Sequence, residues 1–91
     1  MITARQSRAA RALLGWTQET LADAAQISLT ALKRLESQSG FEVYESTRDQ
    51  VRRALEAMGI VFLSTDKGEG VLLLHERAQQ PRRQRQPGRP R

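Results

Sequence analysis

The sequence predicts a mainly α-helical domain of four helices, followed by a β-hairpin and a disordered basic tail. Apolar residues recur at helical spacing up to residue 59. Two short apolar runs rich in strand-forming residues follow at 60–63 and 71–74. From residue 79 onward there is no apolar side chain other than proline, so this part has nothing to bury. We therefore expect a helical domain at 1–59, a hairpin at 60–76 and a tail at 77–91.

Hydroxyl residues mark the starts of the first three helices. Thr3 is expected to cap a helix over 4–14, which Gly15 ends in the left-handed conformation. Thr17 and Ser28 are expected to cap the next two helices, and Glu19 complements the dipole of the first of these. The residues expected to face inward are Ala10, Leu13, Leu14, Leu21, Ala22, Ala25, Leu32 and Leu35, whereas Arg5 and Arg8 are expected to point outward. Two short helices joined by a tight turn predict a helix-turn-helix motif.

A fourth helix is predicted to open at Ser46, which forms a capping-box pattern with Asp49. Its apolar stripe is Val51, Leu55 and Met58, and Gly59 marks its end. The two strands that follow are joined by residues 64–70, which we expect to form a flexible connection. Because the strands do not alternate cleanly between apolar and polar residues, both faces of the hairpin are expected to be covered. We expect it to pack on the helices and to pair with a second copy of itself, since a lone hairpin is marginally stable.

Composition and charge limit the class of protein. The chain has 91 residues, of which 38% are hydrophobic, so it suits one small core. It has no cysteine and therefore no disulfide or thiolate metal site. It lacks a signal-peptide pattern and any apolar run long enough to span a membrane, so a cytoplasmic, nucleoid-associated protein without a membrane partner is expected. The net charge is +5, but residues 1–76 carry −1 and the tail carries +6. Such a tail suggests a polyanionic partner.

Residues 17–36 resemble the helix-turn-helix of the Xre/phage-repressor (Cro/C1-type) family. The resemblance extends over roughly residues 3–59, and its firmest blocks are 11–16 and 17–22. The hairpin resembles a subgroup of small single-domain bacterial members. The resemblance implies a sequence-specific DNA-binding transcriptional regulator, most simply a repressor, that binds a palindromic operator as a homodimer through the hairpin. The second helix of the motif would enter the major groove, with half-sites about 10 base pairs apart.

The resemblance also implies which residues contact DNA. Gln18 occupies the position that contacts a phosphate, and Leu29, Thr30 and Lys33 occupy positions that contact base edges. Lys33 can donate to guanine, and Leu29 or the Thr30 methyl can contact a thymine methyl. The complete expected set is Thr17, Gln18, Ser28, Leu29, Thr30, Lys33, Arg34, Ser37 and Gln38. The family often places glycine in the turn where this chain has Gln26, which carries a backbone cost if φ is positive.

Other conspicuous residues have plainer interpretations. The resemblance implies a structural salt bridge between Arg11 and Glu36. We expect core packing for Trp16 and no metal-binding role for His75. Arg48, Arg52 and Arg53 are expected to form a solvated face, with phosphate contact as the alternative. The same alternative applies to Arg5 and Arg8. The tail is expected to add nonspecific phosphate affinity, although its segment 87–91 resembles the core of a minor-groove AT-hook.

No enzyme chemistry, cofactor or metal site is predicted, because the sequence has no nucleophile–base pair and no phosphate-binding glycine loop. Two other functions remain open beside the DNA-binding repressor. The chain could be the antitoxin of a toxin–antitoxin pair, which would have a toxin as its protein partner. It could also be a protein-interaction adaptor or antiactivator whose helix-turn-helix has lost DNA binding, an alternative that the neutral body keeps open.

Overall fold

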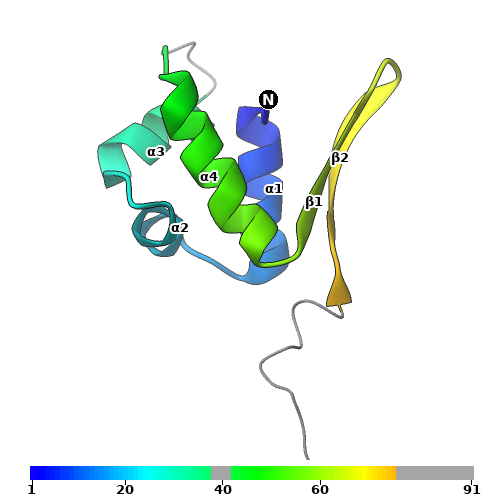
Figure 1. The fold of residues 1–91 in the computed structure, drawn as a ribbon, viewed down its shortest axis with the longest axis horizontal. Coiled ribbons are helices and arrows are strands. Elements are labelled where there is room, and N and C mark those ends of the chain that lie inside the picture. Colours follow the sequence, from blue (N-terminus) through cyan, green and yellow to red (C-terminus); the bar gives the residue numbers. More distant parts are fainter. Residues whose placement is uncertain (38–41, 76–91) are drawn as a thin grey trace, which may run out of the picture.

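The computed structural model describes residues 1–37 and 42–75, which form four helices and one antiparallel hairpin (Figure 1). The elements are α1 (Ala4–Leu14), α2 (Gln18–Ala25), α3 (Leu29–Glu36), α4 (Glu45–Ala57), β1 (Ile60–Thr65) and β2 (Gly68–Leu73). The predicted class, a mainly helical fold with a C-terminal hairpin, is confirmed for the described residues. The predicted tail and Gln38 lie outside them. The described part of the chain contains no helix long and apolar enough to cross a membrane.

The hydroxyl caps of the first three helices are confirmed. The side chains of Thr3, Thr17 and Ser28 accept hydrogen bonds from backbone N–H groups in the first turns of α1, α2 and α3. Gly15 ends α1 at φ 70°, and Gln26 ends α2 at φ 60°. Gln26 is the one non-glycine residue with positive φ among the described residues. The turn between α2 and α3 therefore carries the backbone strain that the sequence suggested.

The predicted start of α4 is wrong. The helix begins at Glu45 with Tyr44 as its N-cap, and no side chain caps it. The Tyr44 carbonyl oxygen accepts from Thr47 N at 3.0 Å and Arg48 N at 3.2 Å, so Ser46 already lies inside the first turn. Ser46 and Asp49 therefore do not occupy the two positions of a capping box, and the Asp49 carboxylate pairs with Arg52 and Arg53, one turn further on.

The core forms where the four helices and the start of the hairpin meet. Its largest buried side chains are Leu21, Leu32, Leu35, Val51, Leu55 and Ile60. Trp16 packs against this core, as expected. The prediction for α1 is partly wrong, because Leu13 is 47% exposed whereas Gln6 and Ser7 are buried beside Ala10. Met58 is also partly exposed, since it follows the last turn of α4 and only Val51 and Leu55 of its stripe are buried.

The hairpin is tighter than the sequence suggested. Thr65 pairs with Gly68, which leaves Asp66 and Lys67 as the two-residue turn instead of a connection over 64–70. The Thr65 hydroxyl oxygen holds this turn by accepting from Lys67 N and Gly68 N, each at 3.1 Å. One face of the hairpin packs on the core through Phe62, Val71 and Leu73. The expectation that both faces are covered is not met within the described chain, because Leu63 and Leu72 on the other face are about half exposed.

Gln6 attaches the hairpin to α1. Its side-chain oxygen accepts from Thr3 N at 3.1 Å, which completes a capping box. Its amide nitrogen donates to the carbonyl oxygens of Leu63 and Gly70, each at 3.0 Å. Leu63 and Gly70 are cross-strand partners, so one buried side chain contacts both strands at the same register position.

Candidate nucleic-acid interface

The outer side of α3 is open to solvent along the part expected to contact DNA bases. Thr30 and Lys33 are exposed and Leu29 is half-buried, whereas Leu32 and Leu35 point into the core. In Figure 1, α3 and the hairpin lie on opposite sides of α1 and α4. The helix therefore presents one polar side, with its capped N-terminus, away from the rest of the fold.

A buried carboxylate fixes the orientation of α3. The side chain of Glu36, at the last position of the helix, is 2% exposed. The Arg11 guanidinium donates to it at 2.8 Å (Nη2 to Oε1) and 3.0 Å (Nε to Oε2), which confirms the expected salt bridge. Ser7 Oγ donates to Oε2 at 2.6 Å, and Gln18 Nε2 donates to Oε1 at 3.0 Å. One side chain of α3 is thus bound to α1 and α2 together.

The pKa of Glu36 reflects this environment. Burial alone would raise the pKa of the carboxyl group, because it disfavours the charged form. The hydrogen bonds from Arg11, Ser7 and Gln18, together with the charge of Arg11, outweigh burial and hold the pKa below its ordinary value. The cluster is therefore ionised at neutral pH and joins all three helices in a charge-assisted network.

Gln18 has a structural contact that the sequence did not predict. Its amide nitrogen is engaged with Glu36, and the side chain is half-buried. Gln18 is also the first residue of α2, where backbone N–H groups have no partner within the helix. The backbone N–H of Gln18 thus lies at the N-terminal end of α2, whereas its side-chain amide is directed to Glu36.

The hydroxyl residues of the expected set serve as caps. Thr17 Oγ1 accepts from Thr20 N at 3.1 Å and lies 2.9 Å from Thr20 Oγ1. Ser28 Oγ accepts from Ala31 N at 3.0 Å. Both residues are exposed, and a hydroxyl that accepts from a backbone N–H can still donate its own proton to a phosphate oxygen. For Thr17, the Thr20 hydroxyl is an alternative acceptor of that proton. Arg34 is exposed and Ser37 is half-buried at the end of the same helix.

Most arginines of the helical body are bound within the protein. Arg8 donates to the backbone carbonyl oxygen of Glu36, which corrects its expected outward position. Arg5 pairs with Glu69 of the hairpin at 2.9 Å. On α4, Arg52 pairs with Asp49 and with Glu56, and Arg53 pairs with Asp49. These two arginines lie on the solvated face that was expected, whereas Arg48 is partly buried and donates to the Ile2 carbonyl oxygen. Of the Lys and Arg side chains in the described part of the chain, those of Lys33 and Lys67 make no hydrogen bond or ion pair.

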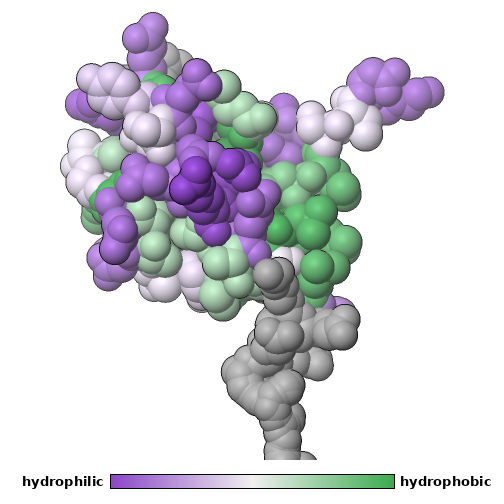
Figure 2. Space-filling view, in the orientation of Figure 1, coloured by the Kyte–Doolittle hydropathy of each residue, from purple (hydrophilic) through white to green (hydrophobic). Residues whose placement is uncertain are grey.

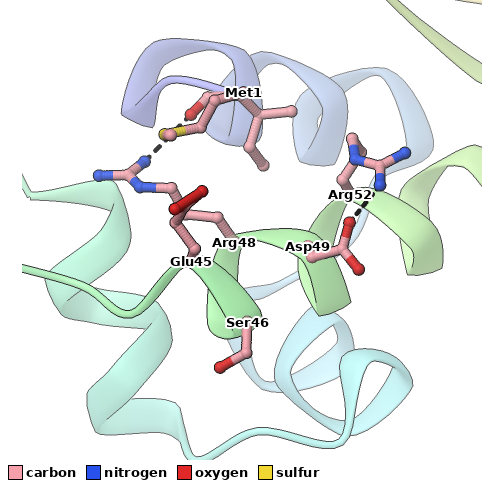
Figure 3. Close-up of a pocket in the computed structure, with 7 residues that line it drawn as sticks. Met1, Glu45, Ser46, Arg48, Asp49 and Arg52 are labelled. Carbon is pink, nitrogen blue, oxygen red and sulfur yellow. Dashed lines mark hydrogen bonds and ion pairs between the residues drawn. The ribbon is translucent and has the colours of Figure 1, made fainter.

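A hollow of about 420 Å³ lies beside the start of α4 (Figure 3). It is lined by Met1, Ile2, Glu45, Ser46, Arg48, Asp49 and Arg52. Both arginines of this lining are engaged within the protein, since Arg48 donates to the Ile2 carbonyl oxygen at 3.0 Å and Arg52 binds Asp49. No group of His, Asp and Glu suited to a metal ion occurs among residues 1–37 and 42–75. The hollow therefore adds no candidate site to the exposed side of α3.

Gln6, Ser7 and Arg8 are the structural residues that sequence reasoning missed. Gln6 and Ser7 are polar residues that lie on the buried side of α1 with Ala10. Helical spacing of Gln6, Ser7, Ala10 and Arg11 is a signal that could have identified this side. Their partners, however, lie 25 or more positions away in the sequence, so the spacing alone does not name them.

Comparison with known proteins agrees with this geometry. A family model described as helix-turn-helix matches residues 8–40, which include α2, the turn at Gln26 and α3. The match covers about a third of the chain and supports a DNA-binding regulator. Helix-turn-helix domains of this kind are regulatory and not enzymatic. Neither the curated proteins nor the solved structures contain a significant match to this chain.

Proposed function

We propose that this protein is a sequence-specific DNA-binding repressor of transcription, acting as a homodimer on a palindromic operator. The observation that carries the proposal is the outer side of α3, where Thr30 and Lys33 are exposed beside a capped helix N-terminus. The Lys33 side chain has no partner among residues 1–37 and 42–75, so its ammonium group is proposed to donate to guanine O6 or N7. Specific affinity is expected at about 10⁻⁸ to 10⁻¹¹ M at physiological salt.

The contacts around α3 divide by type. Leu29 and Thr30 offer apolar groups to a thymine methyl, and Lys33 offers a charge to guanine. Around them, Thr17, Ser28, Arg34, Ser37 and Gln38 are proposed to contact phosphates or flanking bases. The Gln18 contact is assigned to its backbone N–H, because the side-chain amide is held by Glu36. Phosphate contacts fix the register of the helix, and the three base contacts provide specificity.

The test is selection of bound sequences from a random DNA pool, with the full chain and two lysine variants. Lys33→Ala should lose about 1–3 kcal/mol of discrimination at one position of each half-site. Lys67→Ala is the matched control, since Lys67 is the other unpartnered lysine and lies at the hairpin turn. It should select the same sequences as the wild type. An unchanged consensus for Lys33→Ala would contradict the assignment of α3 as the base-contacting helix.

One observation favours a protein-interaction adaptor as the second candidate. Glu19 and Asp23 are exposed on α2, next to the proposed interface, and residues 1–76 carry a net charge of −1. This surface attracts DNA less strongly than a basic one does. Operator binding by a chain shortened to residue 78 would exclude an adaptor that has lost DNA binding. Copurification of a second small protein would instead favour the antitoxin alternative.

A further inference from the structure

One face of the hairpin packs against no other element of the described part of the chain. Successive strand residues point to opposite faces, and Phe62, Val71 and Leu73 take the face toward the helices. Val61, Leu63, Leu72 and Leu74 therefore lie on the other face, together with Gly70, and we call this set the outer face. Leu63, Leu72 and Leu74 are 48%, 49% and 40% exposed. Figure 2 shows hydrophobic surface gathered over the hairpin, beside a largely hydrophilic helical surface.

Neither the backbone angle of Gly70 nor the space around it requires a glycine in the described part of the chain. Its φ is not positive, unlike those of Gly15 and Gly59. A Cβ atom added to it would meet only Leu63 Cδ1, at 4.0 Å, which is ordinary van der Waals contact. Glycine weakens a strand interior, and it often marks a place where another backbone approaches closely. Gly70 thus leaves a notch beside Leu63, in the middle of an exposed apolar face.

The outer face carries no charge that would oppose a copy of itself. The charged residue within β2, Glu69, is bound on the other face by Arg5 at 2.9 Å and Thr3 at 3.0 Å. A symmetric interface brings identical residues together, so a charged side chain there would face its own kind. The chain's own C-terminal residues do not suit this face, because residues 79–91 contain no apolar side chain beyond proline and carry five arginines. DNA is excluded as the occupant, since a polyanion gains nothing from an uncharged apolar surface.

We propose that the outer face of the hairpin is the homodimer interface, with two hairpins stacked face to face and a leucine of each copy seated in the Gly70 notch of the other. The inference deepens the proposed function and rests on it for the two-fold symmetry. It places the two α3 helices on the outside of the dimer, because α1 and α4 lie between α3 and the hairpin in each copy (Figure 1). The patch is small beside the roughly 800 Å² per partner of a standard interface, so a micromolar dimer is expected.

Sedimentation equilibrium of the full chain without DNA tests the interface. The wild type should dimerise with a dissociation constant in the micromolar range. Leu72→Asp places a charge on the outer face and should raise this constant at least 100-fold. Gly70→Val should raise it at least tenfold while the melting temperature of the monomer stays equal or rises, because valine suits a strand and the monomer has room for it. Circular dichroism shows whether each variant is folded.

Tyr44→Asp is the matched control, since Tyr44 is an exposed apolar residue that lies at the start of α4 and away from the hairpin. It should dimerise like the wild type. A wild type that stays monomeric at 100 μM, or a dimer that survives both hairpin substitutions, would overturn the inference. Measuring the affinity of each variant for DNA that carries a single half-site distinguishes a wrong dimer interface from a failure of the proposed DNA-binding function. Leu72→Asp should bind a single half-site with the affinity of the wild type and lose only the extra affinity that the wild type gains on DNA with two half-sites. A wild type that dimerises but does not bind DNA would overturn the proposed function and leave the interface standing.

Discussion

The Glu36 carboxylate accepts hydrogen bonds from two nitrogens of Arg11, and this pair joins the end of α3 to the last turn of α1. The Arg11 side chain is 19% exposed and that of Glu36 is 2% exposed, so water screens the pair weakly. Gln18 adds α2 to the same carboxylate. The orientation of α3 relative to α1 and α2 therefore depends on the side chain of Glu36.

Glu36→Gln should destabilise the fold by about 1.5–3 kcal/mol at pH 7, the range for hydrogen bonds to a charged group. The pKa of Glu36 in the folded protein is lower than in the unfolded chain, where it is about 4.3. Its stabilising contribution is therefore complete above that pH and is lost as the pH falls through the folded pKa. Urea unfolding at pH 7 and pH 3 measures this, and the difference between wild type and variant should shrink at pH 3.

Glu56→Gln serves as the control for this experiment. Glu56 is paired with Arg52 at 2.9 Å, but the side chains are 44% and 37% exposed. An exposed pair contributes little to stability, so this variant should unfold like the wild type at both pH values. Equal effects of the two substitutions would mean that the Glu36 cluster is no more than a surface ion pair.

Gln6→Leu should lower the free energy needed to detach the hairpin from α1 by about 1–3 kcal/mol. The substitution removes the buried amide that donates to the carbonyl oxygens of Leu63 and Gly70. Amide hydrogen exchange of β1 and β2 measures the loss, and the exchange of α2 and α3 should change less. Arg5→Ala breaks an exposed ion pair at the same junction and should cost at most about 1 kcal/mol. If β1 and β2 were protected from hydrogen exchange equally in Gln6→Leu and the wild type, Gln6 would not be the residue that attaches the hairpin to α1.

The features predicted correctly from the sequence are those set by neighbouring residues. Thr3, Thr17 and Ser28 cap the helices that directly follow them, and Gly15 is the C-cap that directly follows the last residue of α1. The Arg11–Glu36 pair was also foreseen, but only through the resemblance to a family. The local pattern gave the wrong start for α4, because the N-cap is Tyr44 and Ser46 already lies inside the first turn. Asp49 pairs with the arginines of the next turn.

Burial by distant elements could not be predicted in the same way. Leu13 has the spacing of a core residue, yet the structure buries Gln6 and Ser7 instead because Glu36 and the hairpin supply polar partners there. The same limit applied to the hairpin, whose apolar runs gave no indication of which face meets the helices. For the candidate site, the sequence identified the exposed side of α3, but not that Gln18 is engaged with Glu36.

Gln26→Gly should stabilise the protein by about 0.5–1 kcal/mol. Gln26 holds φ 60° and ψ 44°, a left-handed conformation that costs an L-residue about 1–2 kcal/mol and glycine almost nothing. The greater freedom of glycine in the unfolded chain offsets part of the gain. Thermal unfolding measures the effect. Ala24→Gly, within α2, is the control and should destabilise by about 1 kcal/mol. A lower melting temperature for Gln26→Gly would mean that the glutamine makes a stabilising contact outweighing the strain.

Ending the chain at residue 76 should weaken binding to all DNA sequences alike and flatten its dependence on salt. The tail carries six arginines and no acid, whereas nearly all arginines of the helical body are bound to acids or carbonyl oxygens. Each arginine that meets a phosphate adds about 0.9 to the slope of log affinity against log salt, so the loss has an upper bound of about five units. Replacing the six arginines with glutamine at full length is the control and should give the same slope as the shortened chain. A selective loss on A·T-rich sites would point to minor-groove insertion by the Gly-Arg-Pro segment, and an unchanged slope would mean that the tail does not contact DNA.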